Sequence, residues 1–128
     1  ITLSLPSFDH SLYVEGEYEL VCKVLENLLT NAIRYAKKTV TMSVTAKKGL
    51  ISITVSDDGE GISEKDLPHL FDRCYKGKGG NFGIGLTIAR SAAQNMGGEL
   101  RAANLPAGGA VFTLVLNAAK RDEHGWPQ

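Results

Sequence analysis

The feature that most constrains the fold is one long helical pattern followed at once by two strand patterns. Between residues 17 and 36, apolar residues recur every three or four positions, which predicts an amphipathic helix. These apolar positions are Leu20, Val21, Val24, Leu25, Leu28, Leu29, Ala32 and Ile33. Alternating residues at 39–46 and 50–55, with Lys47-Lys48-Gly49 between them, predict an antiparallel hairpin. The first half of the chain therefore favours an α+β fold.

The second half predicts the same combination. Helical spacing at 83–96 ends at Gly97-Gly98, a helix-stop signal, and places Leu86, Ile88, Ala89, Ala92 and Ala93 inward. A second hairpin is expected from 99–103 and 110–116. Weaker patterns predict strands at 2–5 and 12–14 and a short helix at 64–71 that Pro68 interrupts. We therefore expect a two-layer α/β sandwich over residues 1–119, with a mixed, mostly antiparallel sheet of about five strands on about three helices, and a polar tail at 120–128.

Composition excludes several classes of protein. The 128 residues contain 14 Lys+Arg and 14 Asp+Glu, so the formal net charge is 0. A balanced charge argues against charge-driven binding of nucleic acid or of a membrane surface. No apolar run approaches the roughly 18 residues of a membrane span, and the first residues do not have the pattern of a signal peptide. Cys22 and Cys74 are too few for a disulfide framework and predict free thiols in a reducing compartment.

Three polar motifs interrupt the core pattern. Asn27, Asn31 and Arg34 fall on one face of the long helix, at the border of its apolar stripe. They could form a solvated edge, or they could face a cleft where amide oxygens bind Mg²⁺ and the arginine binds phosphate. The sequence Asp57-Asp58-Gly59-Glu60-Gly61 follows a strand. It could be a simple turn, or Gly61 could admit a flat ligand whose amino group the carboxylate binds.

The third motif is Gly83-Ile84-Gly85-Leu86 at the start of the second long helix. Backbone N–H groups at a helix N-terminus bind phosphate, although a flexible hinge would look the same. The Walker A sequence of P-loop proteins is absent, and Ile88 occupies the position where a dinucleotide-binding fingerprint needs a small residue. The motif set of protein kinases is absent as well.

The order and spacing of these motifs resemble the catalytic, ATP-binding domain of two-component sensor histidine kinases. That domain belongs to a superfamily shared with DNA gyrase, the heat-shock chaperone ATPases and the mismatch-repair ATPases. The resemblance extends from about residue 2 to about residue 116. It includes an N box at 26–36, a G1 box at 57–61, an F box at 71–76 and a G2 box at 83–86. Cys74 stands where the family usually has phenylalanine.

The resemblance implies ATP and Mg²⁺ as ligands, with a role for each box. Asn31 would coordinate Mg²⁺, and the carboxylate of Asp57 would accept the adenine amino group. Asn27, Arg34 and Arg73 would be the catalytic residues. The implied nucleotide-binding residues are Asn27, Asn31, Arg34, Tyr35, Asp57, Gly59, Gly61, Ile62, Lys76, Lys78, Gly83, Gly85 and Leu86. Residues 72–82 would form a lid over the triphosphate.

The function implied is donation of the γ-phosphoryl group of ATP to a histidine on a separate dimerisation domain. Hydrolysing members of the superfamily carry glutamate where this chain has Asn27, and an amide cannot act as a general base. A self-sufficient ATPase and a degenerate interaction module remain the alternatives. His10, His69 and His124 do not match the phosphoacceptor pattern, so we expect surface positions for them and no autophosphorylation by this domain alone.

The expected partners are the phosphoacceptor domain of the same bacterial kinase and, indirectly, a response regulator. We expect a cytoplasmic, monomeric domain of a larger receptor.

Overall fold

The computed structural model describes residues 2–4, 18–72 and 83–118. Their elements are β1 (Thr2–Ser4), α1 (Tyr18–Tyr35), β2 (Thr39–Lys47), β3 (Leu50–Asp57), the 3-10 helix η1 (Leu67–His69), α2 (Gly83–Asn95), β4 (Glu99–Asn104) and β5 (Ala110–Asn117). The strands form one sheet in the order β1-β2-β3-β5-β4, in which β1 pairs parallel with β2 and the other pairs are antiparallel. The predicted α+β sandwich with a mostly antiparallel sheet is confirmed.

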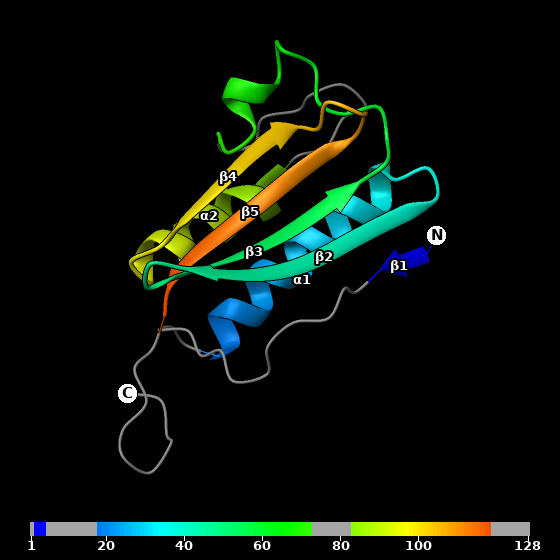
Figure 1. Ribbon diagram of the computed structural model, residues 1–128. Helices are drawn as coiled ribbons and strands as arrows, with labels where there is room; N and C mark the ends of the chain where they lie inside the picture. Colours follow the sequence, from blue (N-terminus) through cyan, green and yellow to red (C-terminus); the bar gives the residue numbers. More distant parts are fainter. Residues whose placement is uncertain (1, 5–17, 73–82, 119–128) are drawn as a thin grey trace, which may run out of the picture.

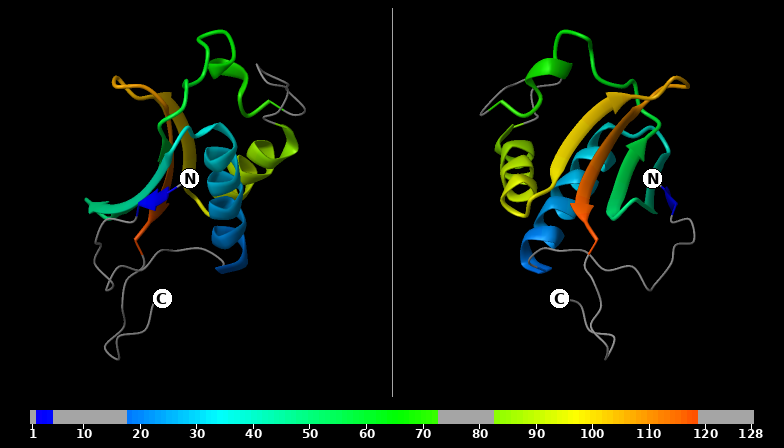
Figure 2. Two further views of the ribbon diagram at one scale, coloured as in Figure 1. Left: turned by 90° about the vertical axis from the view of Figure 1, so that its right-hand side faces the viewer. Right: turned by 60° about the vertical axis from the view of Figure 1, so that its left-hand side comes forward.

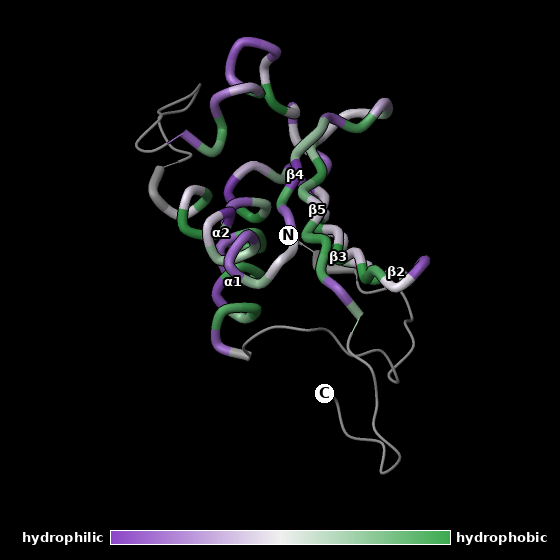
Figure 3. The backbone as a smooth tube through the Cα atoms, turned by 90° about the vertical axis from the view of Figure 1, so that its left-hand side faces the viewer, coloured by the Kyte–Doolittle hydropathy of each residue, from purple (hydrophilic) through white to green (hydrophobic). Residues whose placement is uncertain are grey.

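Both long helices cover the same face of the sheet (Figures 1 and 2), and Figure 3 shows them on one side of β2 to β5. Along β3, buried and half-buried residues alternate, as expected for a strand with only one face covered. The opposite face of the hairpin carries small hydroxyl residues, and Ser43 and Thr54 are hydrogen-bonded across the two strands. The sheet therefore has one apolar face beneath the helices, and its other face is polar over the β2–β3 hairpin.

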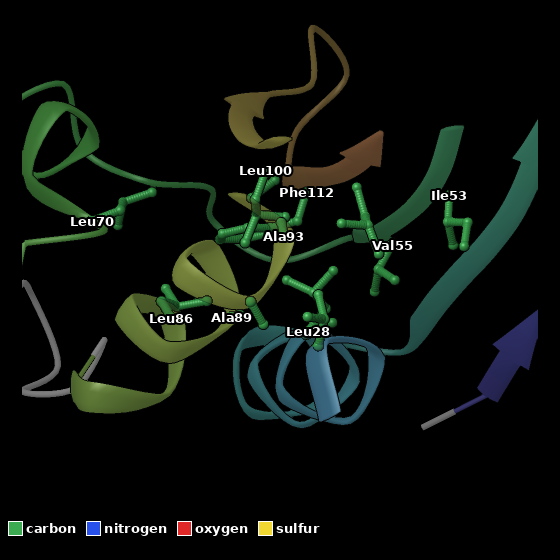
Figure 4. Packing of buried hydrophobic residues seen from close by; sticks show 14 of the residues in the cluster. Leu28, Ile53, Val55, Leu70, Leu86, Ala89, Ala93, Leu100 and Phe112 are labelled. Carbon is green, nitrogen blue, oxygen red and sulfur yellow. The ribbon is translucent and has the colours of Figure 1, made fainter. Parts of the chain in front are cut away.

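The hydrophobic core lies between the helices and the sheet (Figure 4). Its largest fully buried side chains are Phe112, Leu28, Ile51, Leu70, Leu86, Leu114, Leu116, Val24, Val40 and Val55. Complete burial of such a side chain contributes about 1.5–3 kcal/mol to stability. This packing sets α1 and α2 against each other and holds the C-terminal end of α1 near the end of β3.

Two local predictions are wrong. The expected helix at 64–71 is only the 3-10 turn at Leu67–His69. Pro68 would lie in the interior of the longer helix, where it has no N–H to donate to the carbonyl of residue 64, whereas it is tolerated near the start of a short turn. Ile88 was expected inward but is 41% exposed. It lies about 200° around the helix from the buried Leu86, on the opposite side of α2. The expected strand at 12–14 lies outside the described residues.

Candidate nucleotide-binding site

A pocket of about 460 Å³ opens at the end of the sandwich where α1 and β3 finish and β5 begins. The β4–β5 turn and the segment after β3 meet at this end (Figures 1 and 2). The pocket is lined by Asn31, Arg34, Tyr35, Lys37, Asp57, Glu60, Gly61, Ile62, Ser63, Asp66, Ala110 and Phe112. Its volume lies within the range of about 300–1,000 Å³ that is usual for small-molecule sites.

The last two turns of α1 supply one wall of the pocket. Asn31 and Tyr35 are half-buried and Arg34 is exposed, and all three line the pocket. Asn27 lies one turn earlier and is not a lining residue, but its Oδ1 would be 3.4 Å from a Cβ built on Gly85. The N-box helix and the start of α2 are therefore neighbours.

The carboxylate of Asp57 is oriented by two backbone N–H groups. Its Oδ1 accepts hydrogen bonds from Gly59 at 2.9 Å and from Ala110 at 3.4 Å, and the residue is 6% exposed. Among the described residues, Oδ2 of Asp57 has no hydrogen-bond partner. No side-chain nitrogen or oxygen atom that is fully buried lacks a partner in this part of the chain, so Oδ2 is not fully buried. Oδ2 is therefore accessible from the pocket and is available to accept a hydrogen bond from a ligand.

The two glycines of the G1 box, Gly59 and Gly61, have different structural roles. A Cβ on Gly59 would lie 2.1 Å from the carbonyl oxygen of Tyr35, so this glycine allows the loop to pack on the end of α1. It does not line the pocket. Gly61 lines the pocket and has φ +81°, a backbone conformation that favours glycine.

Asp58 connects the same loop to the chain that leaves α1. Its carboxylate accepts hydrogen bonds from the N–H groups of Lys37 at 2.8 Å and Lys38 at 3.0 Å. The backbone N–H groups of Lys38, Thr39 and Lys37 hold the pKa of Asp58 below its ordinary value. The carboxylate of Asp58 therefore stabilises the junction between α1 and β2, whereas Asp57 is the residue of this pair that lines the pocket.

The F-box phenylalanine connects the pocket to α2. The ring of Phe71 packs edge-on against the pocket residue Phe112, with 6.4 Å between centroids. The Arg90 guanidinium lies 5.3 Å from the Phe71 ring centroid, and the Thr87 hydroxyl donates to the Phe71 carbonyl oxygen at 3.1 Å. These contacts fix α2 beside the pocket.

Several residues of the sequence prediction do not line the pocket. Leu86 is 2% exposed and belongs to the hydrophobic core, which gives it a packing role. Gly83 begins α2, and Gly85 faces Asn27. Arg73, Lys76, Lys78 and the expected lid lie outside the described residues.

Sequence reasoning did not assign a site role to half of the lining residues. These are Lys37, Glu60, Ser63, Asp66, Ala110 and Phe112. Ser63-x-x-Asp66 is a capping signal that could have been found, and the Ser63 hydroxyl does accept from the Asp66 N–H at 3.2 Å. Ala110 and Phe112 were expected to have a structural role in the last strand, and both are buried in the core as well as lining the pocket.

One amide side chain at the pocket wall is of the type that can ligate Mg²⁺. Mg²⁺ prefers oxygen ligands and usually shares them with substrate phosphates. Asn31 offers an amide oxygen at the pocket wall. Within the described residues, no group of three or more His, Cys, Asp or Glu side chains could hold a metal ion.

No helix in the described part of the chain is both long and apolar enough to cross a membrane.

The sequence of this chain matches a known protein family. The family model for the histidine kinase-, DNA gyrase B- and HSP90-like ATPases matches residues 16–120. The chain is 43% identical over 112 residues to the signal transduction histidine-protein kinase AfsQ2 of Streptomyces coelicolor, across 81% of this chain and 21% of AfsQ2. It is 32% identical over 130 residues to the sensor histidine kinase WalK of Bacillus subtilis, across 94% of this chain and 21% of WalK.

The fold agrees with a solved structure of the same type. The catalytic domain of histidine kinase ThkA matches with a TM-score of 0.79 at 23% identity, across 90% of this chain and 78% of that domain. The chain spans about one fifth of the length of the curated relatives AfsQ2 and WalK. It belongs to the family of histidine kinase-, DNA gyrase B- and HSP90-like ATPases, as an ATP-binding catalytic domain of the sensor histidine kinase type.

Proposed function

We propose that this domain binds ATP with Mg²⁺ and donates the γ-phosphoryl group to a histidine on a separate domain of the same kinase. The observation that carries the proposal is the carboxylate of Asp57, which is held by two backbone N–H groups and keeps one oxygen available inside the pocket. A carboxylate can accept a hydrogen bond from the amino group of adenine but not from the carbonyl oxygen of guanine.

The phosphate end of the site would lie along α1 toward α2. Arg34 at the pocket wall would bind the phosphates, and the amide oxygens of Asn31 and Asn27 would hold Mg²⁺ and support its phosphate ligands. The ion would neutralise charge that develops on the transferred group. Arg73, Lys76 and Lys78 remain proposed contacts from the segment outside the described residues.

The chemistry would be positioning and charge stabilisation. A nitrogen of the acceptor histidine attacks the γ-phosphorus, the bond to the β–γ bridging oxygen breaks, and ADP leaves. Asn27 lies beside Gly85. Its amide cannot act as a general base, so it cannot remove a proton from water. This arrangement favours transfer to a protein acceptor over hydrolysis, and the self-sufficient ATPase is the weaker alternative.

The partner would be the dimerisation and phosphoacceptor domain, with a response regulator as the later acceptor. The relatives AfsQ2 and WalK are named as kinases and are several times longer than this chain, which supports a partner domain in the same polypeptide. The cytoplasmic location and the monomeric state remain predictions.

Calorimetric titration with ATP and Mg²⁺ tests the proposal, with Asp57→Asn as the variant. Asn can still accept from Gly59 and Ala110 but offers an amide where the second carboxylate oxygen was. We expect ATP affinity to fall about tenfold to a hundredfold, because a buried polar group loses its partner. Asp58→Asn is the matched control, since the same change of charge next to the pocket should leave affinity within about twofold. Equal affinities for the parent and Asp57→Asn would overturn the proposed adenine site.

A further inference from the structure

We propose that Asn104, the last residue of β4, is a positioning residue that fixes the base-facing wall of the pocket and so sets its selectivity for adenine over guanine. This rests on the proposed function, in which Asp57 binds the base. Asn104 does not line the pocket, and no motif of the sequence pointed to it.

The Asn104 side chain holds both backbone groups of one pocket residue. Its Oδ1 accepts from the Ile62 N–H at 2.7 Å, and its Nδ2 donates to the Ile62 carbonyl oxygen at 2.7 Å. This pairing allows one orientation of the amide, because an N–H must face Oδ1 and a carbonyl must face Nδ2. One side chain thus replaces a rung of a β-ladder between segments that are 42 residues apart.

The sheet cannot make this connection. β5 lies between β3 and β4, so the segment that follows β3 has no strand partner in β4. Asn104 reaches that segment from the start of the β4–β5 turn. Within the described part of the chain, Gly61 and Ile62 make no other hydrogen bond to a distant segment, so this wall depends on Asn104 and on packing.

The fit around Gly61 is tight. A Cβ built on this residue would lie 2.8 Å from Asn104 Oδ1 and 3.3 Å from the Gly109 carbonyl oxygen. Gly61 and Ile62 line the same pocket as Asp57, and Ile62 is 8% exposed. The Asn104 amide therefore determines how far this wall stands from the Asp57 carboxylate.

That separation matters for the choice of base. Adenine presents an amino donor where guanine presents a carbonyl acceptor. Asp57 discriminates between them only if the ring is held at hydrogen-bonding distance and water is kept out. By holding the opposite wall in place, the Asn104 contact would allow Asp57 to discriminate between the two bases.

The test is Asn104→Ala in this chain, with calorimetric affinities for ATP and GTP and the melting temperature without nucleotide. We expect ATP affinity to fall about tenfold, as for the loss of one or two hydrogen bonds, and the ratio of ATP to GTP affinity to fall with it. Asn104→Asp provides a second variant of the same size. It keeps an acceptor for the Ile62 N–H but loses the donor to the carbonyl, so it should show the same two losses.

Asn117→Ala is the matched control. Asn117 is an asparagine of the same hairpin, and its Nδ2 donates to the Gly97 carbonyl oxygen at 3.5 Å, away from the pocket residues. It should leave both affinities unchanged, whatever it does to the melting temperature.

The possible failures are distinguishable. If Asn104→Ala keeps the ATP affinity and the ATP-to-GTP ratio of the parent while Asp57→Asn loses binding, Asn104 has no positioning role. A lower ATP affinity with an unchanged ratio would overturn the selectivity. If Asn104→Ala does not fold, Asn104→Asp is read by the same criteria. A parent that binds no ATP would overturn the proposed function and this inference with it.

Discussion

The two ends of the pocket are built in different ways. At the base end, where we propose that adenine binds, hydrogen bonds between side chains and backbone fix the G1 loop: Asp57 accepts from Gly59 and Ala110, and Asn104 holds Ile62. At the phosphate end, where we propose that the triphosphate binds, the pocket wall includes Arg34, which is exposed, and Asn31, which is half-buried. The part of the chain that the structure describes provides no hydrogen bond to either of these two side chains.

This difference matches the ligand that we propose. A flat, uncharged base is only weakly attracted by charged side chains. A site that already has the right shape before the base binds lowers the entropy cost of association. A triphosphate with its metal brings strong charges that can order exposed side chains as it binds. The comparison predicts that substitutions at the base end affect stability as well as affinity, whereas substitutions at the phosphate end affect affinity alone.

The largest expected effect is that of Gly109→Ala, at the base end. A Cβ on this residue would lie 1.9 Å from the Asp57 carbonyl oxygen, and its φ is +92°. We expect the free energy of unfolding, measured with urea, to fall by about 3 kcal/mol or more.

Gly108→Ala is the matched control for Gly109. Its φ is +109°, but nothing lies within 4 Å of the added Cβ. It should cost only the backbone strain, about 1–2 kcal/mol. Equal losses for the two variants would show that the β4–β5 turn is not packed against Asp57 and that this contact does not fix the base end of the pocket.

A smaller effect is expected for Asn31→Ala, at the phosphate end. Contacts to the base would survive, but one oxygen ligand of the proposed Mg²⁺ would be lost. ATP affinity with Mg²⁺ should fall about tenfold, affinity without Mg²⁺ should change little, and the free energy of unfolding should remain that of the parent. Titrations in magnesium and in a chelator measure this. Thr30→Ala, an exposed neighbour on α1, serves as the control. An unchanged magnesium effect would refute the role of Asn31.

The smallest effect is that of Asp58→Asn on the pH dependence of stability. The pKa of Asp58 is lower in the folded chain than in the unfolded chain, where about 3.9 is usual. Its stabilisation is therefore fully present above the unfolded pKa and is lost as the pH falls through the folded pKa. The melting temperature of the parent should exceed that of Asp58→Asn at pH 7, and the gap should close in acid. A gap that persists at the lowest pH would contradict this.

The sequence alone determined the helices, the hairpins and the order of the motifs. Helical spacing and strand alternation are local patterns, and they predicted α1, α2 and the two hairpins within a few residues. The spacing of Asn27 and Asn31 also placed both amides on one helix face. Such properties follow from the geometry of the chain over a few turns, so no knowledge of distant residues is needed.

The tertiary structure decided which distant residues meet. Asn104 and Ile62 are 42 residues apart, and nothing near Asn104 in the sequence marks it as different from any polar residue at the end of a strand. The same holds for Phe112, an ordinary strand position that becomes pocket wall and partner of Phe71. The reason is physical: a motif records what the backbone does locally, whereas a hydrogen bond or a packing contact between segments depends on the sheet order and on the packing of both helices.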